Sequence, residues 1–289
     1  MFTLGVFDGV HLGHQAVVCA AADWARSLGG RAVVLTFDPH PVSVIRGVAV
    51  SLLCTLERRL DLLGALGALV VTLPFDRALA ALPAGDFLSA VRERAPGIRG
   101  LVLGHDGHFG HDREGDAALA AGLGSRLGFE VRTVPALPIG GQPVSSRRIR
   151  AALEGGDAGE ARLCLGRLWT LEGRVAKGDG RGRTLGFPTA NLETGSLLLP
   201  KRGVYAGRAV LDGRAVPAAV NIGVRPTLGP AGTPMAEVHL VGWSGDLYGK
   251  PLSVDLLERL RDEEAFPSLD ALKARIAADV AESIRIAGS

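Results

Sequence analysis

Cysteine is scarce in this chain of 289 residues, aromatic residues make up only 5% of it, and its apolar runs are short. The three cysteines, Cys19, Cys54 and Cys164, are far apart and odd in number. A disulfide framework or a cysteine-based metal site is therefore not expected, and the reducing cytoplasm is the predicted compartment. No apolar run approaches the roughly 20 residues that span a bilayer, and no charged-then-apolar leader predicts secretion.

Lysine is also scarce, so arginine carries most of the positive charge. The lysines are Lys177, Lys201, Lys250 and Lys273. A net charge of +2 with dispersed arginines argues against nucleic acid as the main partner. The content of 47% hydrophobic and 21% charged residues is ordinary for a globular protein. The length allows one large or two ordinary domains, and no internal repeat is visible.

A glycine-rich stretch at residues 5–14, GVFDGVHLGH, joins a short apolar run to a helical pattern. Residues 2–4 predict a strand, and apolar positions in residues 18–28 predict a helix. Open α/β sheets bind ligands at such strand ends, and a helix start suits phosphate. His11 and His14 are three residues apart at that start, so both imidazoles are expected to face one anion. The stretch alone leaves open a plain glycine turn with two surface histidines.

Strands and helices alternate through the first half of the chain. Strands are predicted at residues 31–37, 68–73, 101–104 and 130–134, and helices at 55–66, 87–94 and 116–127. This alternation predicts a doubly wound parallel sheet with right-handed crossovers.

Three polar segments follow this pattern: residues 38–41, 104–110 and 144–150. The first is a rigid turn with two prolines. The histidines and aspartates between His105 and Asp112 match no standard metal spacing, so a solvated loop is the favoured interpretation. In the third segment Ser145 or Ser146 caps the following helix. Each segment alone is explained by local structure.

The character of the chain changes near residues 166–168, which divides it into domains 1–166 and 167–289. Short strands separated by turns begin at residues 169–175, and an amphipathic helix is predicted at 268–286. The glycines of residues 178–191 predict a flexible loop that could lie against phosphates, although a linker explains them equally. It is not a Walker A motif, because the G-K-[ST] ending is absent.

Residues 236–240 predict a strand in which Glu237 and His239 share one face. Val238 and Leu240 share the other face, which is expected to lie in the core. On its own, a strand glutamate such as Glu237 is usually a solvated charge.

Together these stretches resemble the bacterial bifunctional riboflavin kinase/FAD synthetase family, whose first half is a branch of the nucleotidylyltransferase superfamily. The matching strings are G-x-F-D-G-V-H-x-G-H at 5–14, T-F-D-P-H-P at 36–41, G-R-T-L-G-F-P-T-A-N at 182–191, N-I-G-x-R-P-T at 221–227 and R-x-E-x-x-F at 261–266. Two strings match in part. Gly107 replaces the first aromatic residue of G-x-D-F-x-F-G, and His108 stands where the family commonly has arginine. Arg147 replaces the threonine of S-S-T-x-I-R.

The resemblance implies an α/β nucleotidylyltransferase domain, a doubly wound parallel sheet, followed by a small Greek-key β-barrel riboflavin kinase domain with a C-terminal helix. It implies that riboflavin is phosphorylated with ATP to FMN and ADP, and that FMN is adenylylated with ATP to FAD and pyrophosphate. Mg²⁺ is the implied cofactor, and nucleic acid and membrane are not expected as partners. An oligomer is left open. Because relatives carry residues before the first strand, an upstream piece is expected to be missing or mis-assigned.

The resemblance also implies site residues. Glu237 is the expected general base of the kinase, and His11 and His14 stabilise the transferring phosphate. ATP contacts are implied at Gly5, Phe7, Asp8, Gly9, Gly13, Ser145, Ser146, Arg150, Gly178, Gly186, Thr189 and Asn191. Flavin contacts are implied at Asp38, Pro39, His40, Asp106, Phe109, Arg225, Arg261 and Phe266, and metal contacts at Thr189 and Asn191.

Three alternatives stay open. The first is an active kinase with a weak or inactive adenylyltransferase domain, because the departures and the short start lie in the first half. The second is a non-catalytic flavin or nucleotide sensor. The third is adenylylation of another phosphate ester.

Overall fold

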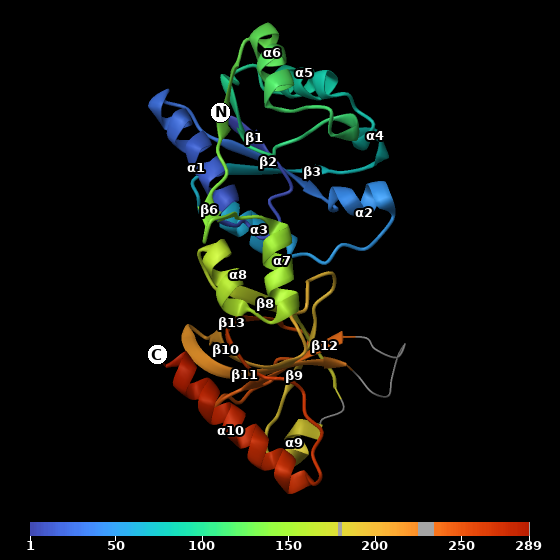
Figure 1. The fold of residues 1–289 in the computed structure, drawn as a ribbon, viewed down its shortest axis with the longest axis vertical. Coiled ribbons are helices and arrows are strands. Elements are labelled where there is room, and N and C mark those ends of the chain that lie inside the picture. The colour runs from blue at the N-terminus through green and yellow to red at the C-terminus, as the bar shows by residue number, and fades with distance from the viewer. Residues whose placement is uncertain (179–180, 225–233, 289) are drawn as a thin grey trace. The chain divides into compact units, whose positions relative to one another are not determined.

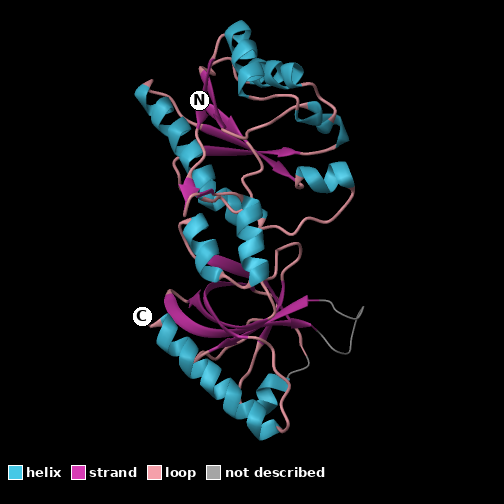
Figure 2. Cartoon of the chain, in the orientation of Figure 1, coloured by secondary structure: helices cyan, strands magenta, loops and turns pink. Residues whose placement is uncertain are grey.

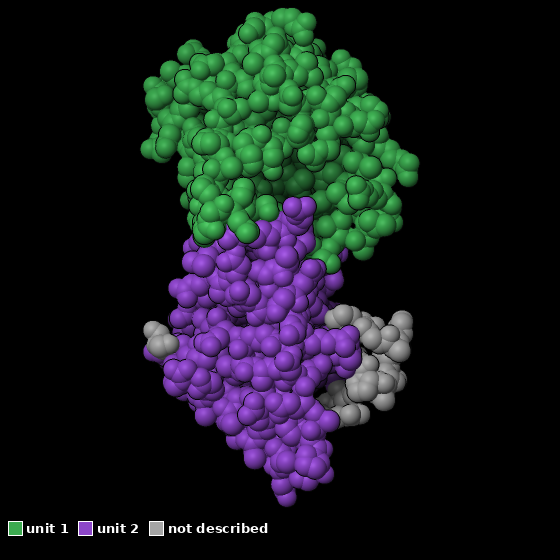
Figure 3. Space-filling model, viewed as in Figure 1, with its two compact units in different colours: residues 1–146 green, residues 147–289 purple. Residues whose placement is uncertain are grey.

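The computed structural model describes residues 1–178, 181–224 and 234–288. The predicted flavin contact Arg225 lies outside the described residues. The chain divides into two compact units, residues 1–146 and 147–289 (Figure 3). No helix in the described part of the chain combines the length and apolar character needed to cross a membrane.

The first unit is built on a five-stranded parallel sheet with strand order β3-β2-β1-β4-β5 (Figure 1). The strands are β1 Phe2–Leu4, β2 Val33–Asp38, β3 Leu69–Pro74, β4 Gly100–Gly104 and β5 Glu130–Val134. The helices are α1 Leu12–Ser27, α2 Pro41–Arg46, α3 Leu56–Gly64, α4 Arg77–Ala80, α5 Ala84–Arg94 and α6 Ala117–Leu127, with the 3₁₀ turn His111–Arg113 and the hairpin β6 Pro138–Ile139, β7 Gln142–Pro143.

Apolar side chains on both faces of the strands explain why helices cover both faces of this sheet. In β4, Leu101 and Leu103 belong to the core cluster that includes α5 and α6, whereas Val102 packs with α1. Val34 of β2 packs in a third cluster with Leu63 of α3. Successive residues point to opposite faces, so one apolar run supplies both cores. The predicted doubly wound sheet is confirmed.

The chain reverses its direction of winding at β1, which pairs with β2 on one side and β4 on the other. Thr3 aligns with Val34 and with Val102. Ligands of open α/β sheets bind beyond the carboxyl ends of the strands at such a reversal. The histidine-containing turn that follows β1 therefore lies where this topology places a ligand.

The second unit contains a closed six-stranded antiparallel barrel with order β10-β11-β12-β9-β8-β13 (Figure 2). Its strands are β8 Trp169–Ala176, β9 Ala190–Glu193, β10 Gly203–Leu211, β11 Arg214–Val224, β12 Pro234–Leu240 and β13 Pro251–Arg261. Its helices are α7 Ser146–Gly155, which starts at the last residue of the first unit, α8 Ala158–Leu165, α9 Arg181–Leu185 and α10 Leu269–Ala287. The last helix packs on β10, β11 and β13.

The structure differs from the predicted loop at residues 178–191, because α9 lies within it. The helix ends in a Schellman motif: Phe187 N–H donates to the carbonyl of Gly182 at 2.8 Å, and Gly186 N–H donates to that of Arg183 at 3.2 Å. Gly186 has a φ of 89°, which an L side chain disfavours. The prediction of a loop was wrong there, because Gly186 ends a short helix instead of continuing a flexible loop.

Candidate active sites

Two of the glycines in the turn after β1 make room for neighbouring side chains. A Cβ on Gly5 would lie 3.2 Å from the ring of Phe7, and a Cβ on Gly13 would lie 3.2 Å from the imidazole of His11. Phe7 has a φ of 53°, which turns its ring into the core cluster beside Val34 and Leu63. These glycines therefore set the positions of Phe7 and His11.

The two histidines of this turn form a stacked pair. Their ring centroids are 3.5 Å apart, with an angle of 18° between the ring planes. The ring centroid of Phe7 lies 5.2 Å from that of His14, with the two planes at 79°. His11 caps α1, because its Nδ1 accepts from the N–H of His14 at 3.2 Å. A neutral His11 therefore carries its hydrogen on Nε2.

Burial, and then the neighbouring His11, lower the pKa of His14 well below its usual value. The Nδ1 atom of His14 is buried and has no hydrogen-bond partner among the described residues. His14 therefore favours the neutral state, and an anion placed against its ring would raise its tendency to bind a proton.

Asp8 holds the turn from within the protein. It is 3% exposed, and its carboxylate accepts from the N–H of Leu53 at 2.9 Å and 3.2 Å. Gly9 has a φ of 80°, and its N–H contacts the Sγ of Cys54 at 3.3 Å. The hydroxyl of Ser146 donates to the Asp8 carbonyl at 2.9 Å. The predicted ATP contacts Asp8, Gly9 and Ser146 are thus brought to one turn.

The predicted flavin residues of the first unit lie at the end of β2 and beyond β4, at the same edge of the sheet. Asp38 and Pro39 are exposed, and the Nδ1 of His40 caps α2 by accepting from Val42 N–H at 3.2 Å. Asp106 is exposed after β4.

Phe109 is only 6% exposed, and its ring lies 6.2 Å from that of Phe87 in the core. Its flavin contact stays a prediction. The predicted residues Ser145 and Arg150 lie just before α7 and within it, in the first and second units respectively.

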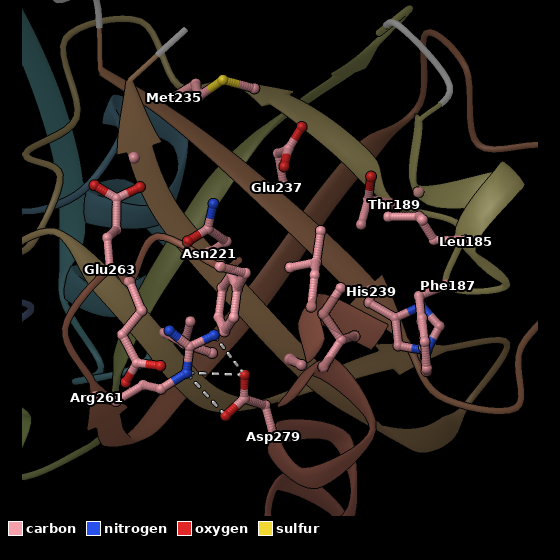
Figure 4. Close-up of a pocket in the computed structure, with 18 of the residues that line it drawn as sticks. Leu185, Phe187, Thr189, Asn221, Met235, Glu237, His239, Arg261, Glu263 and Asp279 are labelled. Carbon is pink, nitrogen blue, oxygen red and sulfur yellow. Dashed lines mark hydrogen bonds and ion pairs between the residues drawn. The ribbon is translucent and has the colours of Figure 1, made fainter. Parts of the chain in front are cut away.

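The second unit has a cavity of about 490 Å³ (Figure 4). Five predicted site residues line it: Thr189, Asn191, Glu237, Arg261 and Phe266. Its volume lies in the range of small-molecule sites. The predicted residues Gly178 and Gly186 lie outside its lining, although Gly178 contacts Asn191.

Strand register aligns three polar side chains across this cavity. Glu237 of β12 is directly opposite Asn191 of β9 on one side and Asn221 of β11 on the other. Directly opposite residues have Cβ atoms about 5 Å apart on the same face. The predicted base therefore lies next to the predicted metal ligand.

Two further contacts shape this end of the cavity. A Cβ on Gly178 would lie 2.0 Å from the Nδ2 of Asn191, so only glycine leaves this amide in place. The ring nitrogen Nδ1 of His239 lies 2.8 Å from the carbonyl oxygen of Pro188. The ring centroids of His239 and Phe187 are 5.6 Å apart. Because a carbonyl only accepts, Nδ1 of His239 donates, which fixes the segment that leads to Thr189.

An ion pair between Arg261 and Asp279 lines the side of the cavity across from Glu237 (Figure 4). Arg261 donates from Nε and Nη2 to the carboxylate of Asp279 on α10, with a shortest distance of 2.7 Å. Both side chains are about nine-tenths buried, at 10% and 8% exposure. The Arg261 guanidinium also lies 5.8 Å from the ring of Phe266. Arg261 therefore lines the cavity while it joins β13 to the last helix.

Among the lining residues that sequence reasoning missed are the polar or sulfur-bearing side chains of Asn221, Met235, Glu263 and Asp279. Asn221 and Glu263 lie inside matched strings, so the strings held a signal for them. Met235 shares a strand face with Glu237, and alternation could have found it. Asp279 lay in an ordinary amphipathic pattern, where nothing distinguished it from a solvated charge.

Comparison with known proteins finds a family match for each half of the chain. The family model described as FAD synthetase matches residues 1–148, and that described as riboflavin kinase matches residues 165–287. The bifunctional riboflavin kinase/FMN adenylyltransferase of Pseudomonas fluorescens is 37% identical over 99% of this chain and 92% of its own. The Escherichia coli K12 protein is 36% identical over 96% and 90%.

A more distant relative and a solved structure extend the similarity. The Bacillus subtilis protein of the same description is 32% identical over 99% of this chain and 92% of its own. A crystal structure described as a macrolide-efflux protein from Streptococcus pneumoniae is 29% identical, with a TM-score of 0.86 over 98% of this chain and 92% of that chain. The chain belongs to the bifunctional riboflavin kinase/FMN adenylyltransferase family.

Proposed function

We propose that the second unit phosphorylates riboflavin with ATP and that the first unit transfers AMP from ATP to the resulting FMN, making FAD and pyrophosphate. The observation that carries the kinase is the row of Asn191, Glu237 and Asn221 across one cavity. The stacked pair of His11 and His14 after β1 supports the adenylyltransferase. The chain is thus a two-step transferase of flavin biosynthesis.

In the kinase, Glu237 accepts the proton of the ribityl 5′-hydroxyl as that oxygen attacks the terminal phosphate of ATP. General base catalysis contributes about 100- to 10,000-fold. Arg261, held by Asp279, and Phe266 bind the flavin on the opposite side of the cavity. Positioning supplies most of the remaining acceleration in phosphoryl transfer.

The residues present fit a magnesium ion. Thr189 and Asn191 offer a hydroxyl and an amide oxygen, which are ligands of the hard type that Mg²⁺ takes. Gly178 leaves space beside the Asn191 amide that a Cβ would fill. The chemistry that Mg²⁺ supplies when bound is neutralisation of charge on the ATP phosphates.

In the adenylyltransferase, His11 and His14 hydrogen-bond the α-phosphate of ATP as the FMN phosphate attacks it. Ser146 holds the leaving pyrophosphate, and Gly5, Phe7, Asp8, Gly9 and Gly13 shape the turn around the nucleotide. The part of Arg150, which belongs to the second compact unit, stays a prediction. Asp38, Pro39, His40, Asp106 and Phe109 belong to the FMN side of this site.

We assign these reactions to residues 1–166 and 167–289, in a cytoplasmic enzyme. Helices α7 and α8 belong to the second compact unit, apart from Ser146 at the start of α7. The alternative is an active kinase with a weak adenylyltransferase. The substitutions at Gly107, His108 and Arg147 favour it.

One time course tests both reactions. Purified protein is incubated with riboflavin, ATP and Mg²⁺, and FMN and FAD are separated by chromatography. We expect FMN to appear first and FAD to follow. His14→Ala should lower FAD formation from supplied FMN by about 100- to 1,000-fold while riboflavin phosphorylation continues. Formation of FMN without FAD would favour the alternative. If neither FMN nor FAD formed, the proposal would be contradicted.

A further inference from the structure

Arg59 is one of only two buried side chains on α3, the other being Leu63. It is 4% exposed, although it carries a charge. Its Nη1 donates to the carbonyl of Val6 at 3.0 Å, and its Nη2 donates to the carbonyl of Phe37 at 2.9 Å. One guanidinium therefore joins two chain segments that are about thirty residues apart.

Both carbonyls belong to segments that we assign to substrates. Val6 directly precedes Phe7, whose ring contacts His14, in the turn after β1. Phe37 directly precedes Asp38 and Pro39 at the end of β2. Arg59 thus lies where the nucleotide turn and the flavin-lining segment leave adjacent strands.

Burying an arginine at this position costs desolvation free energy that packing alone does not offset. No ion pair among the described residues involves Arg59, and its Nε has no hydrogen-bond partner there. Buried charges are ordinarily paired, because removing a charge from water is unfavourable. Two carbonyl oxygens offset only part of that cost, and an anionic ligand next to them would offset more.

We propose that Arg59 is a positioning residue for the adenylyl transfer of the first unit. It holds the two strand-end segments at a fixed separation and supplies permanent positive charge behind the site of two phosphate-bearing substrates. The inference rests on the proposed adenylyltransferase, and it adds a residue that contacts neither substrate. A merely structural Arg59 would change stability and leave the Michaelis constants of the folded enzyme unchanged.

The test compares Arg59→Met, Arg59→Lys and a control, Leu88→Ala, which opens the fully buried core around α5. For each, kcat and the KM values for ATP and FMN are measured together with thermal unfolding. We expect Arg59→Met to lose about 100-fold in kcat/KM, with both KM values raised, as for misplaced binding groups. Arg59→Lys should recover part of this loss, because its ammonium keeps the charge and can donate to a carbonyl, although it lacks the planar fork that reaches both. Leu88→Ala should lower the unfolding temperature with unchanged KM values.

Unchanged KM and kcat in Arg59→Met, or equal kinetic losses in Leu88→Ala, would overturn the proposal. If Arg59→Met does not fold, Arg59→Lys provides the test. Parental KM values for both ATP and FMN in Arg59→Lys would then overturn the proposal. A parent protein that forms no FAD would contradict the proposed function itself. In that case the affinity for ATP, measured by calorimetry, would test the role of Arg59. Equal ATP affinity in the parent protein and in Arg59→Met would contradict that role.

Discussion

The imidazoles of His11 and His14 stack with their centroids 3.5 Å apart, and the N–H of His14 donates to the Nδ1 of His11. The helix start that positions both rings thus also determines which nitrogen of His11 can donate. Two protonated rings at this distance would repel each other strongly. A doubly charged pair is therefore unfavourable unless an anion lies beside it, which fits the proposed contact with the α-phosphate of ATP.

Stability should depend on pH through His14. Because the pKa of His14 is lowered by burial and by His11, the folded protein binds fewer protons there than the unfolded chain does. The free energy of unfolding should be greatest above the unfolded histidine pKa of about 6.5 and fall as pH decreases towards the lower folded-state pKa. Urea unfolding between pH 5 and 8 measures this.

The same measurement on two variants identifies the group. His14→Asn should flatten this part of the profile, whereas His108→Asn, on an exposed loop, should leave it unchanged. A parental slope in His14→Asn would show that another group titrates.

Glu237→Gln should abolish most kinase turnover. The substitution keeps the size and the position between Asn191 and Asn221 but removes the base, so kcat should fall by about 100- to 10,000-fold. Riboflavin phosphorylation measures it, and FAD formation from supplied FMN serves as the control within the same chain. Full kinase turnover would show that Glu237 is not the base.

Asp279→Ala should destabilise the second unit. It leaves the guanidinium of Arg261 buried without its partner, and breaking a buried pair in this way costs about 3–5 kcal/mol. KM for riboflavin should also rise, because Arg261 and Phe266 lose their fixed position. Denaturant unfolding and kinase kinetics measure both effects.

Asp270→Ala is the matched control, since Asp270 is exposed in the first turn of the same helix. It should cost no more than about 1 kcal/mol. Equal losses in both variants would mean that the ion pair contributes little.

Gly178→Ala should raise the Mg²⁺ concentration that the kinase needs. The added Cβ would lie 2.0 Å from Asn191 Nδ2, so the proposed metal ligand must move. Kinase rate against Mg²⁺ concentration measures the shift, with adenylyl transfer unchanged. Gly155→Ala, where a Cβ meets nothing within 4 Å, is the control. An unchanged Mg²⁺ dependence would contradict the assignment of Asn191.

Local patterns were sufficient for most of the fold. Strands such as residues 130–134 were predicted with the observed bounds, because apolar period and turn residues are local properties. The face shared by Glu237 and His239 was likewise predictable, since alternation follows from the pleat of a strand.

The short helix α9 was not predicted, because its signal was a single glycine, Gly186, inside a glycine-rich stretch. The domain boundary near 166–168 stays a prediction.

The sequence by itself determined the two types of fold, the histidine turn and the strings that carry the family resemblance. Only the tertiary structure decided that Asn191 and Asn221 flank Glu237, that Asp279 holds Arg261, and that Arg59 joins Val6 to Phe37. The reason is physical. Periodicity fixes which way a side chain points along its own element, whereas strand register and helix packing fix which distant side chain it meets.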